Sequence, residues 1–514
     1  MSFMNAMKNE MLENFNQSVT ENGAVGYRTT SKSLLNINFA VASLRSASED
    51  EVIERFKRAF FEDKILAMKW LFFARDIRGG LGERRLFRTA MSFVADYEPT
   101  MVEKVIPLIP EYGRFDDMWI LLDDEKLRPV VMEYVKKQLD SDIKNCNDGK
   151  PISLLVKWLP SCNASSASSK KYSKIIRQCL DMTESAYRKT LSRLRKYIDV
   201  VEVKMSAKQW GDIKYEAVPS RANLIYNNAF LRNDEERRRE FLAQLEKGEV
   251  KINADTLFPH DIVHQYCCGR GYYRSELKQY DATIEGLWKN LPDLVDGCGN
   301  TIVVADGSGS MMTTVGGSNT TALEVANALA IYFAERSSGE FKDKYITFSS
   351  RPQFVDFSRG QSLRDKISIA LGHSEVSNTN IEAVFDLILS TAVRNNMSQE
   401  DIPANILIIS DMEFDGAVCC NGRGYGGVSA NLFKVIESKY RSAGYKIPRL
   451  VFWNVNSRTN TIPVRENDMG VALVSGFSVN ICKMVMSGKT DPFECLLETL
   501  NSERYQPVED ALII

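Results

Sequence analysis

Histidine is scarce in this sequence, and its cysteines do not stand at the spacing of a zinc site. Only three histidines occur among 514 residues, and the ten cysteines include no Cys-x-x-Cys pair. A Walker-type phosphate loop is also missing, and no Ser, His and acid set can be assembled from the sequence. These absences argue against a zinc finger, a P-loop nucleotidase and a triad hydrolase, and we expect the protein not to be an enzyme.

Long apolar runs are absent as well. No segment approaches the roughly 20 residues that a membrane-spanning helix needs, and the first residues lack the apolar core of a signal peptide. The adjacent pairs Cys267-Cys268 and Cys419-Cys420 are poorly placed for ordinary disulfides. We therefore expect reduced thiols, no membrane association and a cytoplasmic location, which for a viral protein means the host cytoplasm or the virion.

The small net charge of −2 conceals an uneven distribution. Residues 151–240 contain 18 Lys and Arg against 10 Asp and Glu, a net of +8, so the rest of the chain sums to −10. Helical spacing places Tyr187, Leu191 and Leu194 on one face of a helix, and it places basic side chains on the other. That basic face meets either water alone or phosphate.

Aromatic residues among cations are what RNA needs for stacking and charge neutralisation. Tyr172, Trp210 and Tyr215 occur within this basic region. We expect this region to bind RNA, either a small structured RNA or a single strand. We do not expect sequence-specific DNA binding. The candidate RNA-binding residues are Lys170, Lys171, Lys174, Arg188, Lys189, Arg193, Arg195, Lys196, Lys204 and Lys208.

A buried-strand pattern at residues 302–305 runs directly into Asp306-x-Ser308-x-Ser310. A carboxylate and two hydroxyls at alternating positions can turn toward one point when glycines separate them. Hard oxygen ligands suit Mg²⁺ or Mn²⁺ better than Zn²⁺. The loop alone is equally compatible with a plain strand-to-helix turn.

The C-terminal half alternates strand and helix patterns. Such alternation predicts a doubly wound, mostly parallel sheet, and ligands of these sheets collect beyond the carboxyl ends of the strands. Thr379 before a helix and Asp411 after a strand would lie at that edge with Asp306. The expected strands are residues 302–306, 345–348, 405–411, 449–454 and 470–475, and the expected helices are 321–336, 362–371, 381–393 and 429–442.

The N-terminal half shows helix after helix and almost no strand alternation. Ser48-Glu49-Asp50-Glu51 predicts a capping box at one helix start. Successive helices with short connectors favour an irregular α-solenoid, with a compact helical domain as the alternative. We expect a helical repeat region over residues 1–295 and an α/β domain over 296–514.

Two connectors and one helix carry motifs with two interpretations each. In residues 75–85 and 112–117, glycines beside alternating charges indicate either a tight turn held by ion pairs or, at Gly79-Gly80, backbone N–H groups presented to a phosphate. His260 and His264 share a helical face with Cys267 and Cys268 one turn on, which indicates either a zinc site or capping and packing. The structural interpretation is favoured in both cases.

Asp-x-Ser-x-Ser after the first strand, Thr379 and Asp411 together resemble the metal-ion-dependent adhesion site of the von Willebrand factor A domain. The resemblance implies that Ser308 and Ser310 bind the cation directly, Thr379 directly or through water, and Asp306 and Asp411 mainly through water. An acidic group of a protein partner would fill the open position. Gly307 departs from the larger residue common at that position, which would loosen the loop.

Further motifs resemble the domain of unknown function family 2828 over nearly the whole chain. They are Arg-Asp-Ile-Arg-Gly-Gly from residue 75, Tyr-Gly-Arg-Phe-Asp-Asp from 112, Lys-Trp-Leu-Pro-Ser from 157, Ser-Asp-Met-Glu-Phe-Asp from 410 and Phe-Trp-Asn from 452. Members of that family occur in cells and in large viruses or phages, and they pair a helical region with a von Willebrand A-like domain. This organisation is similar to that of the Ro autoantigen and its TROVE module of HEAT-like helical repeats, which bind RNA.

The favoured hypothesis is a non-catalytic, Ro-like scaffold that binds RNA on its helical region and a protein partner at the metal site. The alternative is a metal-dependent protein-assembly module without RNA binding, belonging to a cellular complex or to a phage or virus particle.

Overall fold

A computed structural model describes most of the chain in two compact units. Unit 1 comprises residues 1–62 and 257–499, and unit 2 comprises residues 63–256 and 500–514. In the described residues no helix is long and apolar enough to cross a membrane. The structure describes residues 4, 7, 16–19, 25–267, 277–295, 300–349, 351–373, 380–413, 430–459, 462, 471–482 and 491–513.

Unit 1 contains a six-stranded sheet in the order β5-β4-β3-β6-β7-β8. The chain begins in the middle of this sheet, runs outward through β4 to β5, and then crosses back to β6 on the other side of β3. All neighbours are parallel except β4 and β5. The strands are β3 (Thr301–Asp306), β4 (Lys344–Phe348), β5 (Phe354–Asp356), β6 (Asn405–Ser410), β7 (Arg449–Asn454) and β8 (Val471–Ser475).

The five predicted strands are confirmed, and the antiparallel edge strand β5 was not predicted. With three residues and only Val355 buried, β5 has too short an alternating pattern to be recognised. A separate two-stranded hairpin, β1 (Gln17–Val19) with β2 (Val25–Tyr27), was also not predicted.

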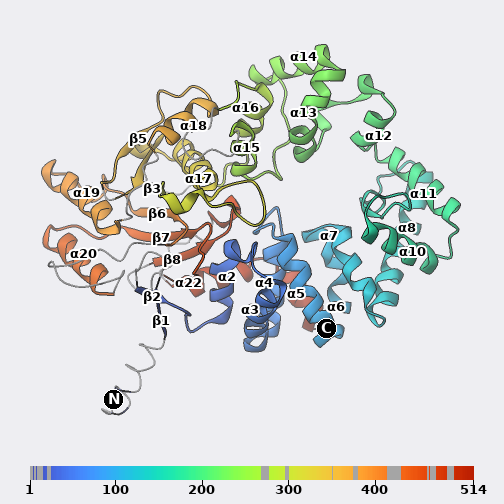
Figure 1. Ribbon diagram of the computed structural model, residues 1–514, viewed down its shortest axis with the longest axis horizontal. Coiled ribbons are helices and arrows are strands. Elements are labelled where there is room, and N and C mark those ends of the chain that lie inside the picture. The colour runs from blue at the N-terminus through green and yellow to red at the C-terminus, as the bar shows by residue number, and fades with distance from the viewer. Residues whose placement is uncertain are drawn as a thin grey trace. The chain divides into compact units, whose positions relative to one another are not determined.

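Helices cover both faces of the large sheet (Figure 1). Side chains on one face, such as Val304 and Ile408, share a buried cluster with α19 and α20. On the other face, Phe333 of α17 packs edge-to-face on Trp453, with ring centroids 5.7 Å apart. The helices of unit 1 are α2 (Ser33–Leu44), α3 (Glu49–Glu62), α15 (Pro259–Tyr266), α16 (Ala282–Lys289), α17 (Ala322–Arg336), α18 (Leu363–Gly372), α19 (Ile381–Arg394), α20 (Ala430–Ser442) and α22 (Pro492–Leu500).

The N-terminal helix α2 packs on the sheet, although the sequence placed it in the helical region. The side-chain amide of Asn454 donates to Phe39 O at 2.9 Å, and Ser475 Oγ accepts from Ala42 N at 3.1 Å. The compact units therefore divide the chain differently from the expected segments 1–295 and 296–514. Ten of the twelve residues of α2 are buried. Because buried residues surround this helix, its periodicity does not show which face contacts the sheet.

Unit 2 is helical, and it includes the C-terminal helix. Lys69 Nζ of α4 pairs with Glu509 of α23 at 2.6 Å. Its α-helices are α4 (Lys64–Arg75), α5 (Arg84–Tyr97), α6 (Pro99–Val105), α7 (Ile109–Tyr112), α8 (Leu127–Asn147), α9 (Leu155–Trp158), α10 (Ala167–Cys179), α11 (Glu184–Tyr197), α12 (Val201–Ser206), α13 (Ser220–Asn233), α14 (Glu235–Glu246) and α23 (Gln506–Ile513).

The connector motifs of unit 2 form one buried ion-pair network. Arg75 pairs with Asp117 at 2.7 Å, and both side chains are at most 5% exposed. Asp76 accepts from Arg504 and from the hydroxyl of Tyr505. A Cβ on Gly80 would lie 1.9 Å from a backbone oxygen, and Gly80 N–H donates to Asp76 O. The ion-paired turn is therefore the interpretation that the structure supports.

Candidate functional site

The Asp-x-Ser-x-Ser loop lies at the topological switch point of the sheet, between β3 and β6, where the strand order reverses. Asp306 ends β3 and Ser410 ends the neighbouring strand. Ser410 Oγ donates to Asp306 Oδ2 at 2.5 Å, and Ser308 N–H donates to Asp306 Oδ1 at 2.9 Å. The hydroxyls of Ser308 and Ser310 are 3.0 Å apart. In open α/β sheets this is the position where ligands bind.

Asp411 brings a second buried carboxylate to the same point. Its side chain is 1% exposed, and Oδ2 accepts no hydrogen bond from any residue that the structure describes. Burial, and next the charge of Asp306, raise the pKa of Asp411 to about 7, whereas the nearby Ser310 hydroxyl opposes the shift. Arg458 lies 3.7 Å from Oδ2, outside hydrogen-bonding range and partly exposed to water, so burial and Asp306 dominate.

These four side chains fit a small divalent cation. Two carboxylates and two hydroxyls supply only hard oxygens, which suit Mg²⁺ or Mn²⁺. A buried carboxylate oxygen without a hydrogen bond, next to a second carboxylate, is costly unless a positive charge compensates it. The structure thus brings together Asp306, Ser308, Ser310 and Asp411 as predicted. Thr379, the fifth predicted ligand, lies outside the described residues.

Glu413 supports this edge, and sequence reasoning did not single it out. Its carboxylate accepts from Arg458 N–H at 2.8 Å and from Thr459 N–H at 2.9 Å, in the loop after β7. In the same loop, Asn456 donates to Thr313 Oγ1 at 3.0 Å. The sequence shows several acids after β6, and that pattern does not reveal which of them accepts hydrogen bonds from the backbone of the loop after β7.

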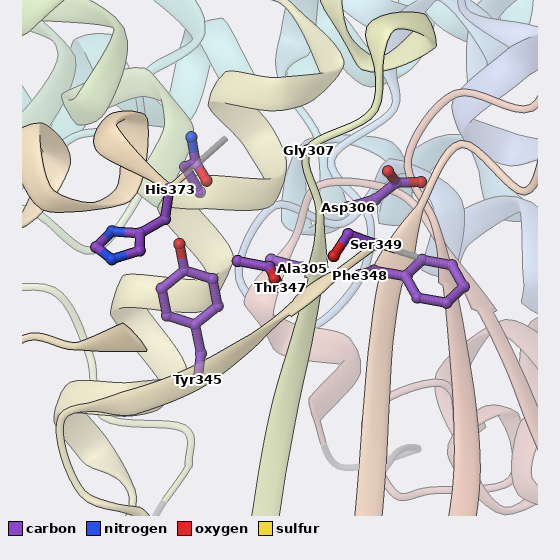
Figure 2. Close-up of a pocket in the computed structure, with 9 residues that line it drawn as sticks. Ala305, Asp306, Gly307, Tyr345, Thr347, Phe348, Ser349 and His373 are labelled. Carbon is purple, nitrogen blue, oxygen red and sulfur yellow. The ribbon is translucent and has the colours of Figure 1, made fainter. Parts of the chain in front are cut away.

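A small polar pocket adjoins the Asp-x-Ser-x-Ser loop on the other side of β3 (Figure 2). Figure 2 shows Tyr345 and His373 on one side of β3 and the carboxylate of Asp306 on the other. Ser349 Oγ is buried there without a hydrogen-bond partner among the described residues. The free space holds about one water molecule, which is too little for a substrate. Tyr345 and Thr347 alternate along β4 and Ser349 directly follows it, a pattern that the sequence already contained.

The histidines near residue 260 serve packing and pairing. His260 is buried, and its ring stacks on Phe258 with centroids 5.7 Å apart. His264 Nδ1 lies 2.9 Å from Glu324, a hydrogen bond that raises the pKa of His264. No group of three metal-binding His, Cys, Asp or Glu side chains occurs within the described residues, and Cys268 lies outside them.

The candidate RNA-binding residues all belong to unit 2. Tyr187, Leu191 and Leu194 are buried, which confirms the predicted core face of α11. Four of the ten basic residues make internal bonds. Arg195 donates to Val156 O, Leu159 O and Ser161 Oγ, and Lys204 bonds Asp199 and Asp212 O. Lys171 pairs with Asp123, and Arg193 donates to Asn147 Oδ1. Eight of the ten, including these last two, are exposed: Lys170, Lys171, Lys174, Arg188, Lys189, Arg193, Lys196 and Lys208.

Two family models match successive parts of the chain. Residues 163–300 match the domain of unknown function DUF2828, and residues 300–508 match the domain of unknown function DUF7788. The expected resemblance to family 2828 is thus confirmed over a shorter stretch than predicted. None of the five motifs that carried the resemblance lies within that stretch, and a different model matches the strand-rich part.

One curated relative and one solved structure are similar over most of the chain. The uncharacterized protein L728 of Acanthamoeba polyphaga mimivirus is 29% identical, and the match covers 96% of this chain and 89% of L728. The crystal structure of the Deinococcus radiodurans RO (RSR) protein matches at 14% identity, covering 88% of this chain and 92% of that one, with a TM-score of 0.35.

Proposed function

We propose that this protein is a non-catalytic scaffold with two separate binding sites. Unit 1 binds Mg²⁺ or Mn²⁺ at Asp306, Ser308, Ser310 and Asp411, and the bound cation takes a carboxylate of a protein partner, as in a von Willebrand factor A domain. Unit 2 binds RNA on its basic surface, by analogy with the Ro autoantigen and its TROVE module, to whose organisation that of family 2828 is similar.

The buried Asp411 carboxylate carries the metal part of the proposal. It stands beside Asp306, with an oxygen that no described residue bonds. Two adjacent carboxylates repel each other, and a divalent cation would convert that repulsion into attraction. The partly exposed hydroxyls of Ser308 and Ser310 lie at the solvent side, where a partner's carboxylate could reach the cation.

A pull-down with added Mg²⁺ or with EDTA tests the metal-dependent docking. We expect the partner to be lost with EDTA and with Ser310→Ala. The serine variant removes a ligand without disturbing the bonds that Asp306 makes to Ser308 and Ser410, so it is less disruptive than Asp306→Ala. Equal recovery under all of these conditions would refute the docking role.

The exposed basic side chains of unit 2 support the RNA part. Eight of the ten predicted residues face solvent, and RNA-backbone binding depends on such charges. Electrophoretic mobility shift with a structured RNA and with a single-stranded RNA, repeated over a salt series, tests it. We expect affinity to fall as salt rises, and failure to bind at the lowest salt would refute RNA binding.

The alternative function, metal-dependent protein assembly without RNA, makes a different combination of predictions. It is favoured by the fact that the metal-fitting geometry lies entirely within unit 1. An EDTA-sensitive pull-down together with no RNA shift at low salt would select this alternative, and RNA binding indifferent to EDTA would select the two-site scaffold.

A further inference from the structure

Unit 2 contains a cluster of arginines that the candidate RNA surface did not include. Arg75, Arg88 and Arg114 converge on two carboxylates, those of Asp116 and Asp117. Arg88 Nε lies 2.7 Å from Asp117, and Arg114 contacts Asp116 at 2.6 Å. Three arginines against two aspartates leave the network with an excess of one positive charge.

Arg84 adds a further positive charge to this network. It is the first residue of α5 and lies on the exposed surface. Burial, and next the charges of Arg114 and Arg88, lower the pKa of Arg84, and the two aspartates only partly offset them. Four arginines therefore share two aspartates. This arrangement leaves two positive charges that an anion would neutralise.

An aromatic ring lies within the same cluster. The guanidinium of Arg114 stacks on Trp158, with Cζ 3.9 Å from the ring centroid, and Lys157 Nζ is 5.8 Å from the same centroid. Trp158 is only partly buried, and its backbone oxygen accepts from Trp119 Nε1 at 3.2 Å, which fixes its position. Stacking on an aromatic side chain holds the guanidinium in a defined orientation.

The cluster is continuous with the predicted RNA surface. Asp123 accepts from Tyr172 at 3.0 Å and pairs with Lys171 at 2.6 Å. Asp116, Asp117 and Asp123 all belong to the 3₁₀ helix Phe115–Asp123, so the arginine cluster and the start of α10 contact the same short helix. A nucleic-acid strand on Lys170 and Lys171 would therefore meet the arginine cluster next.

We propose that Arg84, Arg88 and Arg114 form a binding site for a backbone phosphate of RNA. Arg88 and Arg114 are oriented by their aspartates and by Trp158, whereas Arg84 supplies the charge that no described side chain pairs. Guanidinium groups match the geometry of phosphate oxygens. The proposal rests on the proposed RNA-binding function and names the residues through which unit 2 would act.

Binding of a fluorescently labelled single-stranded RNA of about 12 nucleotides to the full chain tests this site. The variant Arg84→Gln removes one charge and none of the internal bonds described above. The control Arg232→Gln removes the same charge from an exposed arginine of α13. Thermal melting of both variants checks that the fold is intact.

We expect Arg84→Gln to weaken binding about 10-fold, the usual effect of one charge-assisted hydrogen bond. The slope of log K against log salt should fall in magnitude by about 0.7, and Arg232→Gln should match the wild type. Equal affinities for the two variants would overturn the phosphate site while leaving RNA binding in place. No binding by the wild type at low salt would overturn the proposed function and this site with it.

Discussion

Replacing Asp411 by asparagine should make the cation-free protein more stable above pH 7. The pKa of Asp411 rises from 3.8 to about 7 in the folded protein. Because each pKa unit corresponds to about 1.4 kcal/mol, ionising this carboxyl in the folded state costs about 4 kcal/mol more than in the unfolded chain. Asp411→Asn removes the charge at nearly unchanged volume, so it should recover a large part of that cost.

The sign of the pH dependence follows from the raised pKa. Between about pH 4 and pH 7 the folded protein holds a proton on Asp411 that the unfolded chain has released, so stability falls as pH rises through this window. Cation-free wild type should show this fall, and Asp411→Asn should lack it. Mg²⁺ should restore stability to the wild type above pH 7, because the ionised carboxylate binds it, and should have no such effect on the variant.

Chemical denaturation at several pH values, with Mg²⁺ or with EDTA, measures both effects. Asp401→Asn is the matched control, since Asp401 is an exposed aspartate of the same unit whose carboxylate bonds Ser398 and no other described residue. It should respond to Mg²⁺ as the wild type does. A cation-free Asp411→Asn protein that is less stable than wild type above pH 7, or that is stabilised equally by Mg²⁺, would refute the reasoning.

Three further predictions concern stability alone. Arg75→Ala should lower the free energy of unfolding by about 1.5–3 kcal/mol, because buried Asp117 loses one of its two arginine partners and keeps Arg88; urea denaturation measures it, and a loss below about 1 kcal/mol would contradict it. Gly80→Ala should lower the melting temperature, since its Cβ would lie 1.9 Å from Phe73 O, whereas Gly211→Ala, with no atom within 4 Å, should not. His264→Asn should lower the free energy of unfolding by about 1 kcal/mol below about pH 6.5, where protonated His264 pairs with Glu324. That cost should disappear as pH rises through the raised pKa of His264; melting curves across this range that stay parallel would contradict it.

The α/β part could be predicted closely because its signals are local. Strands buried on both faces are continuous apolar runs, and the alternation with helical periodicity dictates a doubly wound order. The bounds of β3, β6 and β7 agree with expectation within a residue. The order β5-β4-β3-β6-β7-β8 then places Asp306 and Asp411 at neighbouring strand ends, so the proximity of four of the five residues predicted for a metal site followed from strand pattern and topology together.

Partner choice between distant segments could not be predicted in this way. Of the helices α2, α4 and α23, the sequence predicted only α4, and nothing local to any of them specifies which unit it joins, because hydrophobic burial is non-directional. The same holds for charge. Composition identified residues 151–240 as basic, but only the tertiary structure showed that the guanidinium of Arg195 donates to backbone oxygens. Only the tertiary structure, likewise, showed that Arg84, outside that range, lies near Arg88 and Arg114 and makes no ion pair with a described residue.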